Sequence, residues 1–274
     1  MSNRLFFLDY HYPQHVGPTA YPGAAQAICR AVSQGLAFHR VSSVVLILSV
    51  VGLLSFFISL RAGVVAFGVF CCAAAFKVGV LGLLGVRLRY TMDQNWRNYA
   101  NTRMAPFTYM SKSSRLWEVT GSSGGHDRKY NAGCSIQLQR KAVRVAYSVP
   151  FPFKPNVKAY TLYLPGAKFV FLPDCVCMIQ GGQCTALHYE HIKWSIGMTR
   201  FVESSAPNDS RVVGQTWQYV NKQGGPDRRF AYNPALVECA YGEFSVNFAN
   251  YRRTKLLLSG TRVAECIIGL PSST

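Results

Sequence analysis

Two long apolar runs near the start dominate the hydrophobic pattern of this chain. Residues 41–60 contain no charged side chain, and residues 62–86 contain only Lys77. A helix of about 20 apolar residues is long enough to cross the hydrocarbon core of a bilayer. In lipid each backbone amide needs a partner within its own segment, so we expect both runs to be helical. The pattern predicts a transmembrane hairpin over residues 41–89, with Arg61 at its turn.

The preceding segment, residues 1–40, is more polar. Within it Ile28, Val32 and Leu36 recur on one helical face. An amphipathic helix at the membrane surface would give this pattern, and so would a first span of low hydrophobicity. The sequence therefore predicts a short bundle of either two or three spans.

Beyond the hairpin the pattern changes to short alternating runs. Residues 90–112 are rich in Tyr, Trp and Arg, which fits a connector at the membrane–water interface. In residues 143–149, apolar and polar side chains then alternate with the period of a half-buried strand. Similar runs, separated by Gly- and Pro-rich turns, occupy residues 158–164, 168–172, 175–180, 192–202, 214–221, 244–251 and 255–258. This series predicts an antiparallel β-sandwich domain over residues 113–274.

The charge is unevenly distributed. The 274 residues include 29 Lys and Arg against 12 Asp and Glu, and the formal net charge is +17. Most of the excess follows the hairpin, beginning with Arg87 and Arg89, which we interpret as anchors at the membrane interface. Because Lys and Arg accumulate on the cytoplasmic side of membranes, we expect residues 113–274 to lie in the cytosol.

Five basic residues are the predicted contacts to an anionic partner: Arg228, Arg229, Arg252, Arg253 and Lys255. A basic surface next to a membrane attracts lipid headgroups, RNA or an acidic or RNA-coated protein. A surface that is basic only for topology and solubility would have the same composition. No recognised RNA-binding motif accompanies these residues.

Lys77 is an ionisable residue within the second apolar run. One interpretation places it near a helix end, from which its amine extends to the interface. The other makes it an intramembrane polar site that faces a bundle interior or a water path.

Cysteine and histidine are concentrated in one stretch, at Cys175, Cys177, Cys184, His188 and His191. These are candidate zinc ligands, although alternation on a strand gives the same C-x-C spacing and buried cysteines often serve only as small apolar side chains. The nine cysteines, an odd number in a domain expected to be cytosolic, argue against a disulfide framework. We predict no cofactor. Catalytic motifs for hydrolases, nucleotide-binding enzymes and metalloproteases are absent, so we predict that the protein is not an enzyme.

Two short segments carry a resemblance to a known family. KSSRLWEVTG at residues 112–121 and IKWSIGMTRFVESSAPNDSRVVGQTWQYV at residues 192–220 are similar to segments of the membrane (M) proteins of nidoviruses, of the coronavirus and torovirus type. The second includes the step Arg211-Val212-Val213-Gly214. The order of membrane bundle, aromatic connector and basic β-domain also resembles that family.

The resemblance implies a structural protein of the viral envelope, without enzymatic activity. It implies a homodimer in internal host membranes, of the ER or Golgi, and in the virion envelope. Its β-domain would contact the nucleoprotein and RNA, and lateral association with itself and with other envelope proteins would drive budding. The alternative is a viroporin-like ion channel of the same architecture, with Lys77 lining the path.

Overall fold

A computed structural model describes residues 9–11, 22–54, 59–83, 85–124, 128–130, 132–134, 136–261 and 265. The chain divides into two compact units. Unit 1 comprises Met1–Asn98, Ser148–Thr161 and Gly166–Ala186, and unit 2 comprises Tyr99–Tyr147, Leu162–Pro165 and Leu187–Thr274.

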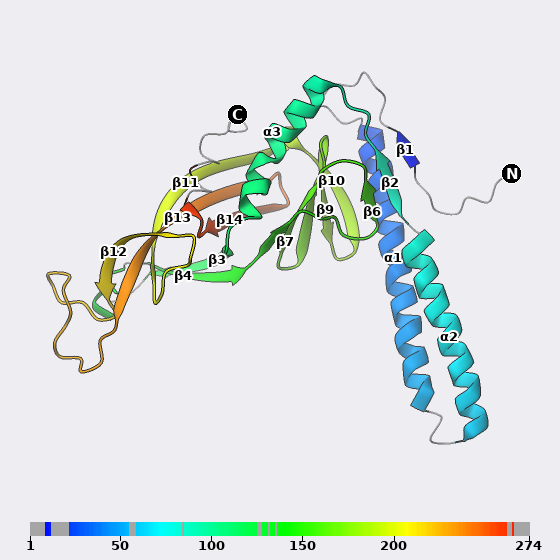
Figure 1. Cartoon of the computed structure of the whole chain (residues 1–274), viewed down its shortest axis with the longest axis horizontal. Coiled ribbons are helices and arrows are strands. Elements are labelled where there is room, and N and C mark those ends of the chain that lie inside the picture. Colours follow the sequence, from blue (N-terminus) through cyan, green and yellow to red (C-terminus); the bar gives the residue numbers. More distant parts are fainter. Residues whose placement is uncertain are drawn as a thin grey trace. The chain divides into compact units, whose positions relative to one another are not determined.

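Two long helices form a hairpin in unit 1. Helix α1 (Pro22–Gly52) has 31 residues, helix α2 (Leu60–Leu83) has 24, and the two lie side by side (Figure 1). Helix α1 continues through residue 40, so the predicted amphipathic segment is its first half and forms no separate span. Gly35 does not interrupt α1, and it lies close to Pro152, whose Cγ would be 3.0 Å from a Cβ at that position, a tight contact. The described residues therefore contain two helices that are long and apolar enough to cross a membrane.

Unit 1 also contains a small parallel sheet in the order β1-β2-β6. Its strands are β1 (Asp9–His11), β2 (Val86–Arg89) and β6 (Phe153–Pro155). The antiparallel prediction does not cover this sheet, because its strands come from segments far apart in the chain. The connection from β1 to β2 contains the whole helical hairpin, and such long connections permit parallel pairing.

Antiparallel strands complete unit 1. Strands β8 (Ala167–Phe171), β9 (Cys175–Gln180) and β10 (Gln183–His188) are neighbours in the order β10-β9-β8. Strand β7 (Tyr160–Leu164) follows β8 in this order, and the division between the two units falls within β7.

The core of unit 1 joins the first half of α1 to these strands. Ile28 and Val32 of α1 are fully buried. They belong to one apolar cluster with Leu88 of β2, Phe153 of β6 and Val170 of β8, among others. Protein side chains thus cover the beginning of α1.

Unit 2 is built on a six-stranded antiparallel sheet. Its order is β11-β13-β14-β3-β4, with β12 paired to β13. These strands are β3 (Leu116–Gly124), β4 (Ile136–Ala142), β11 (Ile192–Glu203), β12 (Arg211–Trp217), β13 (Ala235–Phe248) and β14 (Arg252–Leu258). Shorter elements are β5 (Arg144–Ala146) and two single turns of 3₁₀ helix, Arg128–Tyr130 and Tyr189–His191.

Most of the predicted interfacial connector, residues 90–112, is helix α3 (Gln94–Met110). Within unit 2, its Met104, Phe107 and Met110 are buried. The ring of Phe107 packs edge to face on Phe244 of β13, with 6.4 Å between centroids. This side of α3 therefore covers one face of the sheet.

The predicted fold class is confirmed in its coarser form. Two apolar helices precede antiparallel sheets, and the chain departs from the antiparallel pattern in the small parallel sheet of unit 1. Packing of the sheets into a sandwich stays a prediction.

Candidate membrane hairpin, basic residues and cysteine cluster

Helix α1 passes through two environments. In its first half the core of unit 1 covers Ile28 and Val32, whereas Val41 is 57 % exposed and Leu48 is 63 % exposed. The side chains of α1 change from buried to exposed near residue 38. One half of α1 is thus a core helix of a folded unit, and the other half presents apolar side chains outward.

Residues 41–54, which are the second half of α1 and the two residues after it, form with α2 an apolar hairpin whose side chains face outward. Its large exposed apolar residues are between 41 % and 69 % exposed. They are Val41, Val44, Val45, Ile47, Leu48, Val50, Val51, Leu54, Leu60, Val64, Val65, Phe67, Val69, Phe76, Val78 and Leu81. Soluble monomers rarely expose a contiguous apolar surface of this extent, and a bilayer removes its cost.

Lys77 of α2 is bound by α1 of the same hairpin. Its Nζ donates to Ser43 Oγ at 2.6 Å, to the His39 carbonyl at 3.0 Å and to Ser42 Oγ at 3.3 Å. Arg61 lies about 24 Å away along the axis of α2, at 1.5 Å per residue. A hydrocarbon core is about 30 Å thick, so these two cations bracket an apolar segment that nearly matches it. This geometry favours the interpretation of Lys77 as a residue near the end of a span.

Arg87 and Arg89 follow α2 closely, on β2. They are exposed, and they alternate with the buried Val86 and Leu88. They lie at the same end of the hairpin as Lys77, and their role as interface anchors stays a prediction.

The five predicted basic contacts differ in their surroundings. Arg252 is 26 % exposed, and it donates to the buried carboxylate of Glu118 at 2.6 Å and to the Pro165 carbonyl at 2.9 Å. Arg229 pairs with the buried Asp227 at 2.6 Å. Both side chains therefore have structural partners within unit 2.

The remaining three basic residues are exposed: Arg228, Arg253 and Lys255. Lys255 pairs with Glu243 at 2.8 Å, and the described residues show no ion pair for Arg228 or Arg253. Asn247 of β13 pairs with Lys193 of β11 on one side and with Arg253 on the other, so these cations lie in one row across the sheet. Lys193 was not among the predicted contacts, because only the register of β11 on β13 brings it into this row.

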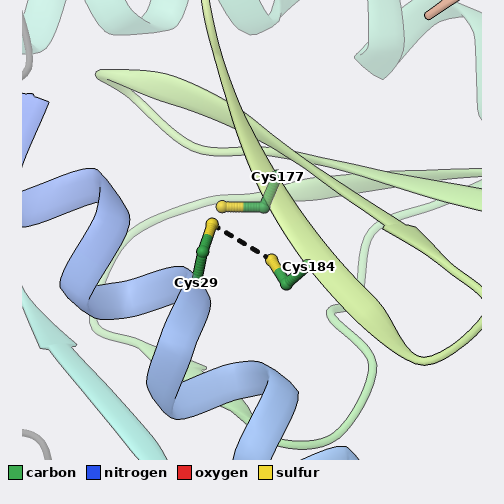
Figure 2. A group of neighbouring side chains, drawn as sticks. All are labelled: Cys29, Cys177 and Cys184. Atoms are coloured by element: carbon green, nitrogen blue, oxygen red, sulfur yellow. Dashed lines mark hydrogen bonds between the residues drawn. The ribbon is translucent and has the colours of Figure 1, made fainter.

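Three cysteines meet in the core of unit 1 (Figure 2). Cys29 comes from α1, Cys177 from β9 and Cys184 from β10, and their sulfur atoms all lie within 4.8 Å of one another. The Cys184 thiol donates to Cys29 Sγ at 3.3 Å. Cys177 has no exposed surface, and Cys29 is 6 % exposed. We refer to these three residues as the cysteine cluster.

The cysteine cluster differs from the predicted set of metal ligands. It includes Cys177 and Cys184, and Cys175 lies nearby on β9 in the same apolar cluster. His188 and His191 belong to unit 2, where their rings contact each other edge to face at 6.4 Å. Cys29 was missed because it lies far from the others in sequence and only tertiary packing brings it there.

One face of α1 holds the β9–β10 hairpin in place beside the cluster. The backbone amide of Cys184 donates to Ser33 Oγ at 2.9 Å. At the hairpin turn Gly182 has φ +82, and the guanidinium of Arg40 occupies the space that a side chain there would need. Cys29, Ser33 and Arg40 recur with helical spacing, so the same face of α1 makes all three contacts.

Within the cysteine cluster, hydrogen bonds with Cys177 and Cys184 lower the pKa of the Cys29 thiol to about 4, whereas the pKa values of the two strand thiols are raised. Hydrogen bonding to Cys175, to Cys184 and to Cys29, together with burial, raises the pKa of Cys177. A hydrogen bond with Cys177 lowers the pKa of Cys184, but the bond to Cys29 and burial outweigh it and raise that pKa overall. Ionisation of the two strand thiols therefore needs a compensating positive charge.

No protein-family model, curated protein or solved structure matches this chain. Its function is therefore inferred from its own residues and their contacts.

Proposed function

We propose that this protein is a membrane-anchored structural protein of a viral envelope, which scaffolds virion assembly and budding. The observation that carries the proposal is the outward-facing apolar surface of residues 41–54 and α2. A bilayer is the partner that removes this surface from water. The viral assignment rests on the layout and on the two segments that resemble nidovirus M proteins.

The charges indicate an orientation. Arg40, Lys77, Arg87 and Arg89 lie at one end of the apolar hairpin and Arg61 lies at the other. By the positive-inside rule, the end with more cations faces the cytosol or the virion interior. That end leads into β2 and the rest of the chain, where nucleoprotein and RNA would be reached.

Self-association is supported by small side chains on α2. Gly68, Cys72, Ala75 and Gly79 recur with helical spacing. No atom lies within 4 Å of a Cβ placed at Gly68 or Gly79. Small residues let membrane helices approach closely, so this face suits a second copy of the chain or another envelope protein.

The alternative, a viroporin-like channel, makes Lys77 line an ion path. Its amine instead has three acceptors on α1 of its own hairpin, which favours the scaffold. In liposomes we expect Lys77→Ala to leave ion flux at the level of the unmodified chain. A change in flux or ion selectivity would favour the channel.

Particle release tests the scaffold itself. The protein is expressed in cells with and without the nucleoprotein of the same virus, and sedimentable vesicles that contain it are quantified in the medium. We expect release, and more of it when the nucleoprotein is present. A protein that folds, reaches internal membranes and releases no particles under either condition would contradict the proposal.

A further inference from the structure

We infer that the cysteine cluster is a zinc site, in which Cys29, Cys177 and Cys184 bind one Zn²⁺ as thiolates. The inference is independent of the viral assignment. It differs from the zinc site considered from the sequence, because Cys29 of α1 takes the place of the two histidines.

The geometry of the sulfur atoms fits this ion. Zinc–thiolate bonds of about 2.3 Å with tetrahedral angles place neighbouring sulfur atoms about 3.8 Å apart. The three sulfur atoms lie within 4.8 Å of one another, and one pair is 3.3 Å apart. A Zn²⁺ at the centre therefore needs only small movements of the three side chains.

The chemistry of the cluster also fits. Thiolates are soft ligands that favour zinc over magnesium or calcium. The surroundings are apolar, with Val32, Ile28 and Ile179 in the same cluster, so a thiolate there needs a cation beside it. Because side chains alternate along a strand, Cys175 lies on the same face of β9 as Cys177. It is therefore the candidate for the fourth zinc ligand.

The role of the metal follows from the elements that it joins. Cys29 lies on the helix that continues into the apolar hairpin, whereas Cys177 and Cys184 lie on adjacent strands. Zinc would fix α1 to the β9–β10 hairpin at the point where Ser33 and Arg40 also contact it. Structural zinc sites contribute to folding in this way, so metal removal should loosen unit 1.

A disulfide is the competing use of the same thiols. Joining Cys29 and Cys184 would need an oxidant, and it would leave Cys177 without a role. The orientation proposed above places these thiols on the cytosolic side of the membrane, where thiols are kept reduced. The metal uses all three sulfur atoms.

The test measures zinc in the full-length chain, purified in detergent without chelators. We expect about one zinc per chain by elemental analysis, and loss of the zinc in Cys29→Ser and in Cys184→Ser. Cys239→Ser is the matched control, since Cys239 is a fully buried cysteine in unit 2, and it should keep the zinc.

Cobalt binding provides a second measurement, which does not depend on how much metal the chain gained or lost during purification. Co²⁺ added to the chelator-treated, unmodified chain should give thiolate-to-cobalt charge-transfer absorption, which Cys239→Ser keeps and Cys29→Ser lacks. Size-exclusion chromatography verifies that the compared variants are folded. Zinc binding should also weaken as the pH falls, because a cysteine binds zinc as a thiolate and must release its proton to do so.

Three results would overturn the inference. One is an unmodified chain with background zinc and no cobalt absorption. Another is full zinc content in a folded Cys29→Ser variant. The third is a Cys29–Cys184 disulfide, found by mass spectrometry in a chain that contains no zinc.

Discussion

Two neighbouring arginines on β14 show how different the roles of adjacent residues are. Arg252 lies on the face of the sheet that carries Glu118, whereas Arg253 lies on the opposite face beside Asn247. Successive side chains on a strand point to opposite faces, so the alternation separates a structural cation from an available one.

The first prediction concerns these two residues. Arg252→Ala leaves the buried Glu118 carboxylate without its cation, and breaking such a pair costs about 3–5 kcal/mol. Arg253→Ala, the matched control, should change the free energy of unfolding by less than about 0.5 kcal/mol. Thermal unfolding of the full chain in detergent distinguishes the two. Equal stability of both variants would contradict the structural role of Arg252.

The carboxyl group of Asp209 should make the stability of unit 2 depend on pH. Its carboxylate accepts hydrogen bonds from the Ser114 amide at 2.8 Å and from the Ser114 hydroxyl. Burial raises the pKa of Asp209, but the bonds from Ser114 and Ser259 outweigh it and lower that pKa overall.

A lowered pKa means that ionised Asp209 stabilises the fold above the pKa of the unfolded chain, about 3.9. This stabilisation is lost as the pH falls through the lower folded value. In Asp209→Asn we therefore expect reduced stability at neutral pH and a smaller further loss in acid than in the unmodified chain. Parallel acid-unfolding curves for the two proteins would contradict this.

Cross-linking through a cysteine on α2 tests self-association of the helical hairpin. Cys72 is exposed on the small-residue face with Gly68 and Gly79, and its neighbour Cys71 is exposed one helical step away. In membranes we expect mild oxidation to cross-link chains through Cys72, so Cys72→Ala loses the dimer band and Cys71→Ala keeps it. Loss of the band only in Cys71→Ala would place the contact on another face.

The sequence predicts some elements closely because their patterns are local. The runs at 168–172, 175–180 and 192–202 correspond to β8, β9 and β11 within one residue at each end. The predicted run at 244–251 overlaps only the end of β13, which begins at Ala235 and ends at Phe248. In that strand Ala240, Tyr241 and Gly242 are buried in succession, which hides the alternation.

The elements that the sequence did not resolve depend on tertiary contacts. Nothing local marks the point where α1 leaves the core of unit 1, because the helix is continuous through Arg40. The hydrogen bond between the thiols of Cys29 and Cys184 likewise requires α1 to lie against the β9–β10 hairpin. Strands β1, β2 and β6 are short, and their parallel pairing depends on segments far apart in the chain.

Lys193 and Arg253, the exposed cations in one row across the sheet of unit 2, are the contacts that we expect for RNA or nucleoprotein. Lys193→Ala/Arg253→Ala removes two exposed cations that flank Asn247. Each lost phosphate contact lowers the slope of log K against log salt by about 0.7 for single strands, so the double variant should lose about 1.4. Binding of the full chain to single-stranded RNA over a salt series measures it. An unchanged slope of log K against log salt would show that this row does not contact the RNA.

A charge placed within residues 41–54 and α2 tests whether this hairpin lies in a bilayer. Leu48 and Val65 are 63 % and 69 % exposed, so lysine at either position would be harmless in water. At the centre of a lipid-embedded helix each lysine costs about 2.5–3.5 kcal/mol. The measurement is the fraction of Leu48→Lys/Val65→Lys that stays with membranes after alkaline extraction. We expect the unmodified chain to stay with the membranes and the double variant to be extracted or degraded. Equal retention of a folded double variant, or extraction of the unmodified chain, would contradict it.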